Sequence, residues 1–160
     1  MTKIVFAVDI DAPAQRVFNA VVDWRGQDLW IPFTTVRPGK QAGIAVGGEI
    51  AAVTGIGPLA VLDTMTITRW EIPTRVDVLH TGRIVRGIGI MRVEQLSDQK
   101  SRFYWAEDLD LPLGVLGQVG WLAIKPAFAL GMRASLKKFA ELVESGELGT
   151  KITAEGMPTQ

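Results

Sequence analysis

The segment after Gly114 carries the longest helical pattern in the chain, and it sets how the strand-like segments before it can be buried. Its apolar positions recur on one stripe at helical spacing, and most of its charged residues lie off that stripe. Pro126 either begins this helix or kinks a longer one that begins near Leu116. The stripe consists of Ile124, Phe128, Gly131, Ser135, Phe139 and Leu142.

Six segments ahead of this helix have the composition and alternation of β-strands. They cover residues 33–40, 47–56, 59–72, 76–81, 89–96 and 101–109, with turn sequences EIPT and SDQK between two pairs of them. An antiparallel meander cannot bury one whole face without cover, and the long helix is the only predicted element large enough to supply it. A curved sheet around one helix leaves a space between them, which is a natural pocket.

The first 22 residues predict one further strand and a short helix. In MTKIVFAVDI, residues Ile4, Phe6, Val8 and Ile10 share one face of a half-buried strand. Asp11 can cap the helix that follows, with Pro13 in its first turn and an apolar stripe behind it. The chain is thus predicted to be an α+β domain, with about seven curved antiparallel strands around a long C-terminal helix and one or two short helices after the first strand. We expect this domain over residues 1–147 and a flexible tail over residues 148–160.

Composition excludes several classes of site. Lysine plus arginine equals aspartate plus glutamate at 17 each, so the net charge is zero and gives no long-range attraction to nucleic acid. The absence of cysteine excludes disulfides and cysteine-ligated metals, and the single histidine, His80, excludes a metal site with two or three histidines. No glycine-rich phosphate loop, dinucleotide fingerprint or nucleophile elbow is present. We therefore expect no metal and no cofactor.

The N-terminal sequence lacks the long apolar core of a secretory signal, because its charges come too early and too often. No stretch of about 18 uncharged apolar residues exists that could span a membrane. We therefore expect a cytoplasmic protein without a transmembrane segment, which could form a homodimer.

Three stretches carry a resemblance to a known family. DIDAPAQRVFNAVVDW, residues 9–24, is similar to an opening pattern of strand, A-P, V-F/W and D. ITRWEIPTRVDV, residues 67–78, is similar to a strand, P-x-R, strand hairpin, and SLKKFAELVE, residues 135–144, to a C-terminal helix. In this order they resemble the START-related and polyketide cyclase superfamily (SRPBCC), whose helix-grip fold is also that of the birch pollen allergen. The resemblance covers about residues 3–146 and implies a pocket for a hydrophobic molecule, but no particular reaction.

Strand alternation indicates which polar residues enter that pocket. On the last strand the apolar set is Phe103, Trp105 and Leu109, and Glu107 shares its face. On the strand over residues 76–81, His80 shares the inward face of its apolar neighbours. The long strand over residues 59–72 is ambiguous, because Asp63 and Arg69 share the parity of Met65 and Ile67; a bulge could resolve this. Burial tends to raise the pKa of a carboxylic acid and to lower that of a histidine, so His80 and Glu107 are candidate acid–base residues.

Large apolar side chains are expected to form the rest of the wall. Trp105 and Phe128 should face each other across the pocket, and methionines suit an adaptable wall. The complete set of predicted ligand-binding residues is Trp30, Met65, His80, Met91, Phe103, Trp105, Glu107 and Phe128.

Three functions remain open on this basis. The first is a non-catalytic carrier or sensor that encloses one hydrophobic small molecule, such as a lipid, a polyketide or an aromatic compound. The second is an enzyme of the polyketide cyclase, aromatase or dehydrase kind, in which His80 and Glu107 move protons. The third is a protein–protein module whose cavity is vestigial.

Overall fold

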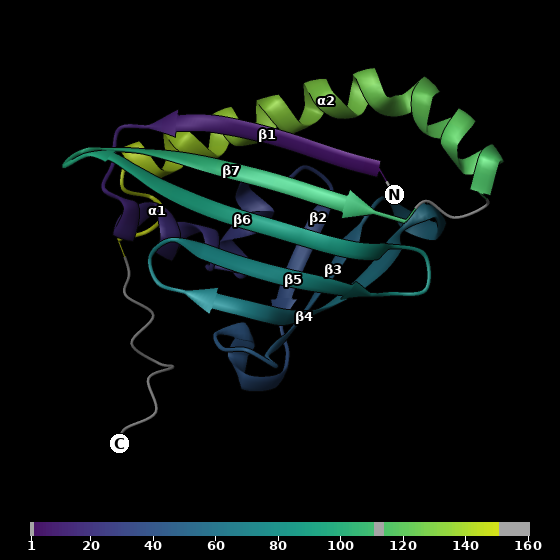
Figure 1. Cartoon of the computed structure of the whole chain (residues 1–160), viewed down its shortest axis with the longest axis horizontal. Coiled ribbons are helices and arrows are strands. Elements are labelled where there is room, and N and C mark those ends of the chain that lie inside the picture. Colours follow the sequence, from purple (N-terminus) through teal and green to yellow (C-terminus); the bar gives the residue numbers. More distant parts are fainter. Residues whose placement is uncertain (1, 111–113, 151–160) are drawn as a thin grey trace.

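The computed structural model describes residues 2–110 and 114–150 and contains one strongly curved sheet with a long helix across it (Figure 1). Within these residues the sheet has seven antiparallel strands in the order β1-β7-β6-β5-β4-β3-β2. Neighbours in the chain are neighbours in the sheet from β2 to β7, and β1 closes the row beside β7. The strands are β1 (Thr2–Ile10), β2 (Thr34–Pro38), β3 (Glu49–Thr54), β4 (Val61–Glu71), β5 (Arg75–Thr81), β6 (Arg86–Ser97) and β7 (Lys100–Leu109). The predicted helix-grip architecture is confirmed.

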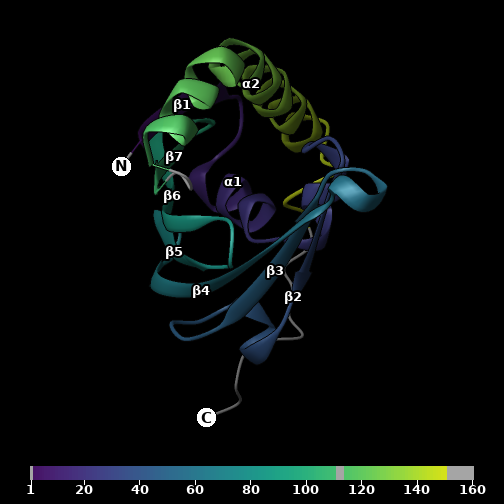
Figure 2. The ribbon, with the colours of Figure 1, turned by 90° about the vertical axis from the view of Figure 1, so that its right-hand side faces the viewer.

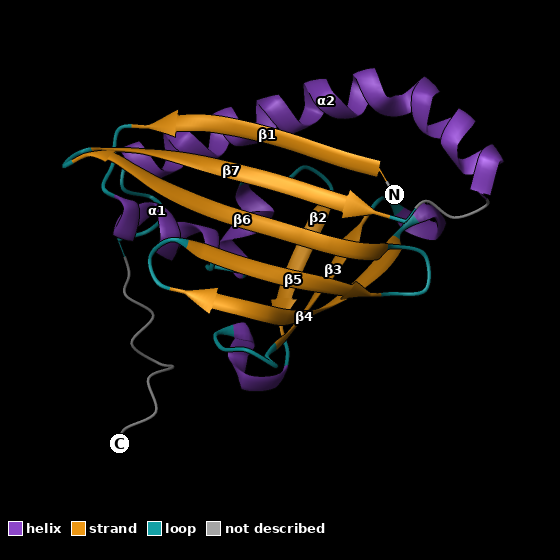
Figure 3. Cartoon of the chain, viewed as in Figure 1, coloured by secondary structure: helices purple, strands orange, loops and turns teal. Residues whose placement is uncertain are grey.

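Helices α1 and α2 lie on the concave side of this sheet (Figure 2 and Figure 3). In the end-on view the sheet curls from β1 down to β4 and up again to β2, and α2 crosses the open side (Figure 2). The helical elements are α1 (Ala14–Val21), the short 3-10 turns η1 (Arg25–Leu29), η2 (Lys40–Gly43) and η3 (Gly57–Leu59), and α2 (Gly114–Glu144).

Helix α2 has 31 residues and is therefore about 46 Å long, with Pro126 inside it. The longer of the two predicted helices is thus the one that forms. Its C-terminal half packs into the domain, where Leu136 and Phe139 are buried. Leu122 in its N-terminal half and Leu130 near its middle are exposed, and Leu130 points away from the cavity that Phe128 and Met132 line. None of the helices in the described part of the chain is long and apolar enough to cross a membrane.

Helix α1 begins later than the sequence suggests. The predicted cap, Asp11, is wrong: the N-cap position is Pro13, and no side-chain cap comes from within the helix. Instead the Ala14 amide N–H donates to Oε1 of Gln95 on β6, at 2.6 Å. The cap is a contact between segments far apart in the chain, so local sequence could not show it. The predicted apolar stripe is confirmed, since Val17, Phe18 and Val21 are buried.

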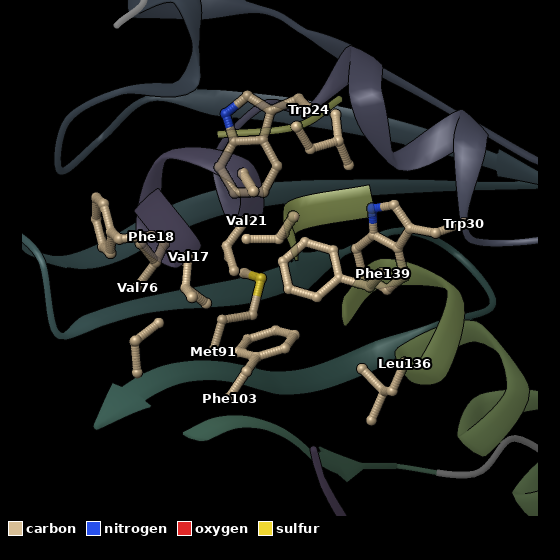
Figure 4. Packing of buried hydrophobic residues seen from close by; sticks show 14 of the residues in the cluster. Val17, Phe18, Val21, Trp24, Trp30, Val76, Met91, Phe103, Leu136 and Phe139 are labelled. Atoms are coloured by element: carbon tan, nitrogen blue, oxygen red, sulfur yellow. The ribbon is translucent and has the colours of Figure 1, made fainter. Parts of the chain in front are cut away.

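Where the C-terminal half of α2 packs into the domain, buried aromatic and aliphatic side chains form a tightly packed core (Figure 4). The ring of Phe139 lies 4.8 Å from that of Trp30 and 5.1 Å from that of Phe103, measured between centroids. Leu148 is also buried, and its amide N–H donates to the carbonyl of Leu142. Of the predicted tail, residues 151–160 lie outside the described residues.

Strand β4 contains a register shift that resolves the ambiguous alternation of its side chains. Its register with β5 shifts between Ile67 and Arg69. Before the shift Met65 and Ile67 point inward and are buried, and after it Arg69 is exposed while Trp70 packs edge-on against Phe18. The shift restores the apolar face, because one extra residue reverses the direction of the side chains that follow. It also leaves Asp63 on the inward side.

Candidate functional site

A cavity of about 250 Å³ lies between the concave face of the sheet and α2. Strands β2 to β7, η1 and the middle of α2 all contribute to its wall. Apolar side chains dominate that wall: Trp24, Ile31, Val36, Ile50, Ala52, Met65, Val78, Val85, Ile90, Met91, Trp105, Leu109, Phe128 and Met132. Its polar contributors are Gln27, Thr34, Thr54, Asp63, His80 and Glu107. A mostly apolar wall with a few polar groups is typical of a small-molecule site.

Three of these polar side chains form one hydrogen-bonded row. Nδ1 of His80 lies 2.7 Å from Oδ2 of Asp63, and its Nε2 lies 3.0 Å from Oε2 of Glu107. Their side chains are 15%, 6% and 12% exposed for Asp63, His80 and Glu107 respectively, so the row is largely removed from water. The row ends at Trp105, whose Nε1–H donates to Oε1 of Glu107 at 2.8 Å.

The sheet register explains how residues on β4, β5 and β7 meet. His80 pairs with Met65, so Asp63, two residues earlier on the same face of β4, is its diagonal neighbour. Strand β6 lies between His80 and Glu107, and Gly89 is paired with Glu107 there. A Cβ atom at Gly89 would stand 3.2 Å from Nε2 of His80 and 3.3 Å from Oε2 of Glu107. The missing side chain therefore leaves the space in which the two residues make their hydrogen bond.

The row gives His80 an unusual proton affinity. Burial alone would lower the pKa of His80, because it disfavours the charged ring. The hydrogen bonds to Asp63 and Glu107 and the charges of both carboxylates outweigh burial and raise this pKa to about 9. The expectation of a lowered pKa for this histidine is therefore wrong: burial acts in the expected direction, but the two carboxylates outweigh it. At neutral pH the ring carries both protons and donates to a carboxylate on each side.

The hydrogen-bonding capacity of the row is almost fully used. Both ring nitrogens of His80 and both oxygens of Glu107 have partners. Oδ1 of Asp63 is buried and has no hydrogen-bond partner within the described part of the chain. The carboxylates lie on opposite sides of the ring, so the three groups do not converge on one point as metal ligands would. No group of three or more His, Asp or Glu residues suited to a metal occurs among residues 2–110 and 114–150.

Six of the eight predicted ligand-binding residues line the cavity: Met65, His80, Met91, Trp105, Glu107 and Phe128. Trp105 and Phe128 are thus both in its wall. Trp30 and Phe103 point inward but pack against Phe139 in the solid core and are not among the lining residues. They lie where the C-terminal half of α2 covers the sheet closely. A side chain that points inward there enters the packed core and not the cavity. This geometry gives no support for direct contact between a ligand and these two residues.

The sequence reasoning missed Asp63 and Gly89. Asp63 carried a signal, since it shares the parity of Met65, but the unplaced bulge left its direction open. Gly89 shares the inward parity of Met91 in GIGIM, and an inward glycine between two inward polar residues on flanking strands could have marked their meeting point.

Comparison with known proteins agrees with this architecture. A family model described as polyketide cyclase / dehydrase and lipid transport matches residues 1–144. The chain belongs to this family. A search of curated proteins found no match.

Several solved structures share the family fold at low sequence identity. A protein of Thermus thermophilus superposes with a TM-score of 0.75 at 14% identity, covering 91% of this chain and 99% of its own. The Zhui aromatase/cyclase from Streptomyces sp. R1128 gives a TM-score of 0.70 at 14% identity, with 96% and 98% covered. BexL, a di-domain ARO/CYC from the BE-7585A biosynthetic pathway, gives 0.68 at 17% identity, with 90% of this chain and 47% of BexL covered. At these identities the likeness establishes the fold alone.

Proposed function

We propose that the protein is a carrier or sensor that encloses one hydrophobic small molecule in the cavity between sheet and α2. The observation that carries the proposal is the cavity wall, in which fourteen side chains are apolar and the three ionisable ones form a single row. Transfer of apolar surface from water into such a wall is worth about 25 cal/mol per Å². The polar row then fixes the orientation of a ligand whose body is held by the hydrophobic effect.

The state of the polar row favours binding over turnover. A general base needs a free lone pair, and a general acid needs a proton that it can release to the substrate. The protonated His80 has no free lone pair, and both of its ring protons are held in hydrogen bonds to Asp63 and Glu107. Acid–base catalysis by His80 would require one of these hydrogen bonds to open first.

Two adjacent alanines on β3 provide a sharp test. Ala52 lines the cavity, whereas Ala51 has the opposite parity and is not part of its wall. Ala52→Phe should fill the cavity and weaken binding of the neutral fluorescent probe phenylnaphthylamine at least tenfold. Ala51→Phe, with the same added volume outside the cavity, should bind the probe like the wild type. If both variants bind the probe equally well, the probe does not bind in this cavity and the proposal is contradicted.

A second function is supported by the histidine between two carboxylates, since such groups can move protons once a substrate displaces one partner. It is an enzyme of the cyclase, aromatase or dehydrase kind acting on a poly-keto chain. The double variant His80→Gln/Glu107→Gln separates the two functions. A carrier should keep most of its affinity for the apolar probe, whereas an enzyme should lose turnover of a poly-keto substrate entirely.

A further inference from the structure

The charge inside the cavity is unbalanced. Among the described residues that line it there is no lysine or arginine, and the acidic residues are Asp63 and Glu107. His80 is the one basic side chain in that lining. With both carboxylates ionised the row has a net charge of −1 when His80 is protonated and −2 when it is not.

Because the row is buried, its negative charge interacts strongly with any molecule that enters the cavity. All three side chains are at most 15% exposed, and the adjoining wall is apolar. A charge in such a place interacts far more strongly with a neighbour than it would in water, because little solvent screens it. A second negative charge would meet repulsion and would lose its own hydration.

The unused hydrogen-bonding capacity of the row is of one kind as well. The donors of the row are committed: His80 donates to both carboxylates, and the indole of Trp105 donates to Glu107. The nearby Thr34 and Thr54 hydroxyls bond to each other, and the amide group of Gln27 donates to the Val21 carbonyl. What remains open in the row is acceptor capacity, because a carboxylate oxygen can accept more than one hydrogen bond, whereas Oδ2 of Asp63 and both oxygens of Glu107 have one partner each. Oδ1 of Asp63 has no partner within the described residues, but it is closed to solvent in the present position of the side chain.

We propose that the cavity selects amphiphiles whose apolar body ends in a hydrogen-bond donor, an ammonium group or a hydroxyl, and that it rejects carboxylates. The head group would lie at the row and donate to a carboxylate oxygen of Asp63 or Glu107, while the apolar body occupies the space between Met65, Met91 and Phe128. This inference rests on the proposed function, since it names the ligand class of the same cavity.

Three ligands that share one decyl chain provide the test: decylamine, decanol and decanoate. Each displaces bound phenylnaphthylamine from the full chain near neutral pH, below its micelle concentration, where the amine is cationic and the acid anionic. We expect decylamine to bind at least tenfold more tightly than decanoate, with decanol also ahead of decanoate. Decanoate equal to or tighter than decylamine would overturn the selectivity while leaving the cavity a binding site. Failure of phenylnaphthylamine itself to bind would overturn the proposed function as well.

Variants locate the effect at the row. Asp63→Asn removes one negative charge and should reduce the ratio of decylamine to decanoate affinity at least fivefold. Asp110→Asn removes the same charge from an exposed residue outside the cavity and should leave the ratio unchanged. If Asp63→Asn does not fold, Glu107→Gln serves the same purpose. A ratio that moves equally in the cavity variant and in Asp110→Asn would contradict the inference.

Discussion

The pH dependence of folding follows directly from the position of His80 between two acids. Its pKa is raised from 6.5 to about 9 in the folded chain. Between these two values the folded state holds a proton that the unfolded state has lost, so the free energy of unfolding falls by about 1.4 kcal/mol per pH unit. The contribution of His80 is fully present below pH 6.5 and is lost as the pH rises through 9.

The expected size is about 3 kcal/mol over this window, from about 2.5 pH units at the slope just given. The His80 side chain is only 6% exposed, so solvent screening removes little of this amount. A domain of this kind has a total stability of about 5–15 kcal/mol, and the change is therefore large enough to measure by urea unfolding. Measurements between pH 5 and 9 avoid the titration of lysine and tyrosine and reach well below pH 6.5.

The double variant Asp63→Asn/Glu107→Gln should reverse the sign of this dependence. Without the carboxylates only burial acts on the ring and lowers the pKa of His80, so the folded state prefers the neutral ring. Stability should then be lost as the pH falls through 6.5. The matched control, Asp110→Asn/Glu141→Gln, neutralises two exposed acids and should keep the wild-type profile. A flat wild-type profile, or identical profiles for the two double variants, would refute the reasoning.

Two further stability predictions rest on matched pairs. Gly89→Ala places a methyl group 2.9 Å from Cγ2 of Val78 and beside the hydrogen bond between His80 and Glu107, so urea unfolding should show a loss of about 1–3 kcal/mol. Gly131→Ala on α2, where a Cβ meets nothing within 4 Å, should instead gain up to about 1 kcal/mol, and a loss there would contradict the packing described. Phe139→Ala, at a fully buried site, should cost about 3–5 kcal/mol, whereas Phe33→Ala, at 69% exposure, should change stability by less than about 0.5 kcal/mol; similar effects would mean that the aromatic core is misplaced.

Much of the fold follows from local pattern. The alternation on β1, β5 and β7 places Ile4, His80 and Phe103 on the correct face, because the side-chain period of a strand is fixed by its backbone. The stripe on α2 likewise predicts the burial of Phe139 and Leu142. These features depend on residues close together in the chain.

What the sequence did not reveal depends on contacts between distant segments. The cap of α1 comes from Gln95, 81 residues away, and the pairing of His80 with Asp63 depends on the register of β4 with β5. The direction of the pKa shift of His80 depends in turn on that pairing, since burial alone would have lowered it. Trp30 and Phe103 show the same limit, because parity says that a side chain points inward but not whether cavity or core lies there.

A titration with decanol followed by carbon-edited NMR tests the central claim most directly, since His80 is the only histidine and Met65 and Met91 both lie on the cavity wall. We predict that the ring signals of His80 and the methyl signals of Met65 and Met91 shift together and saturate at one ligand per chain. Unchanged signals from these three residues, with shifts confined to exposed side chains such as Leu59 and Leu122, would show binding at the surface and contradict the account.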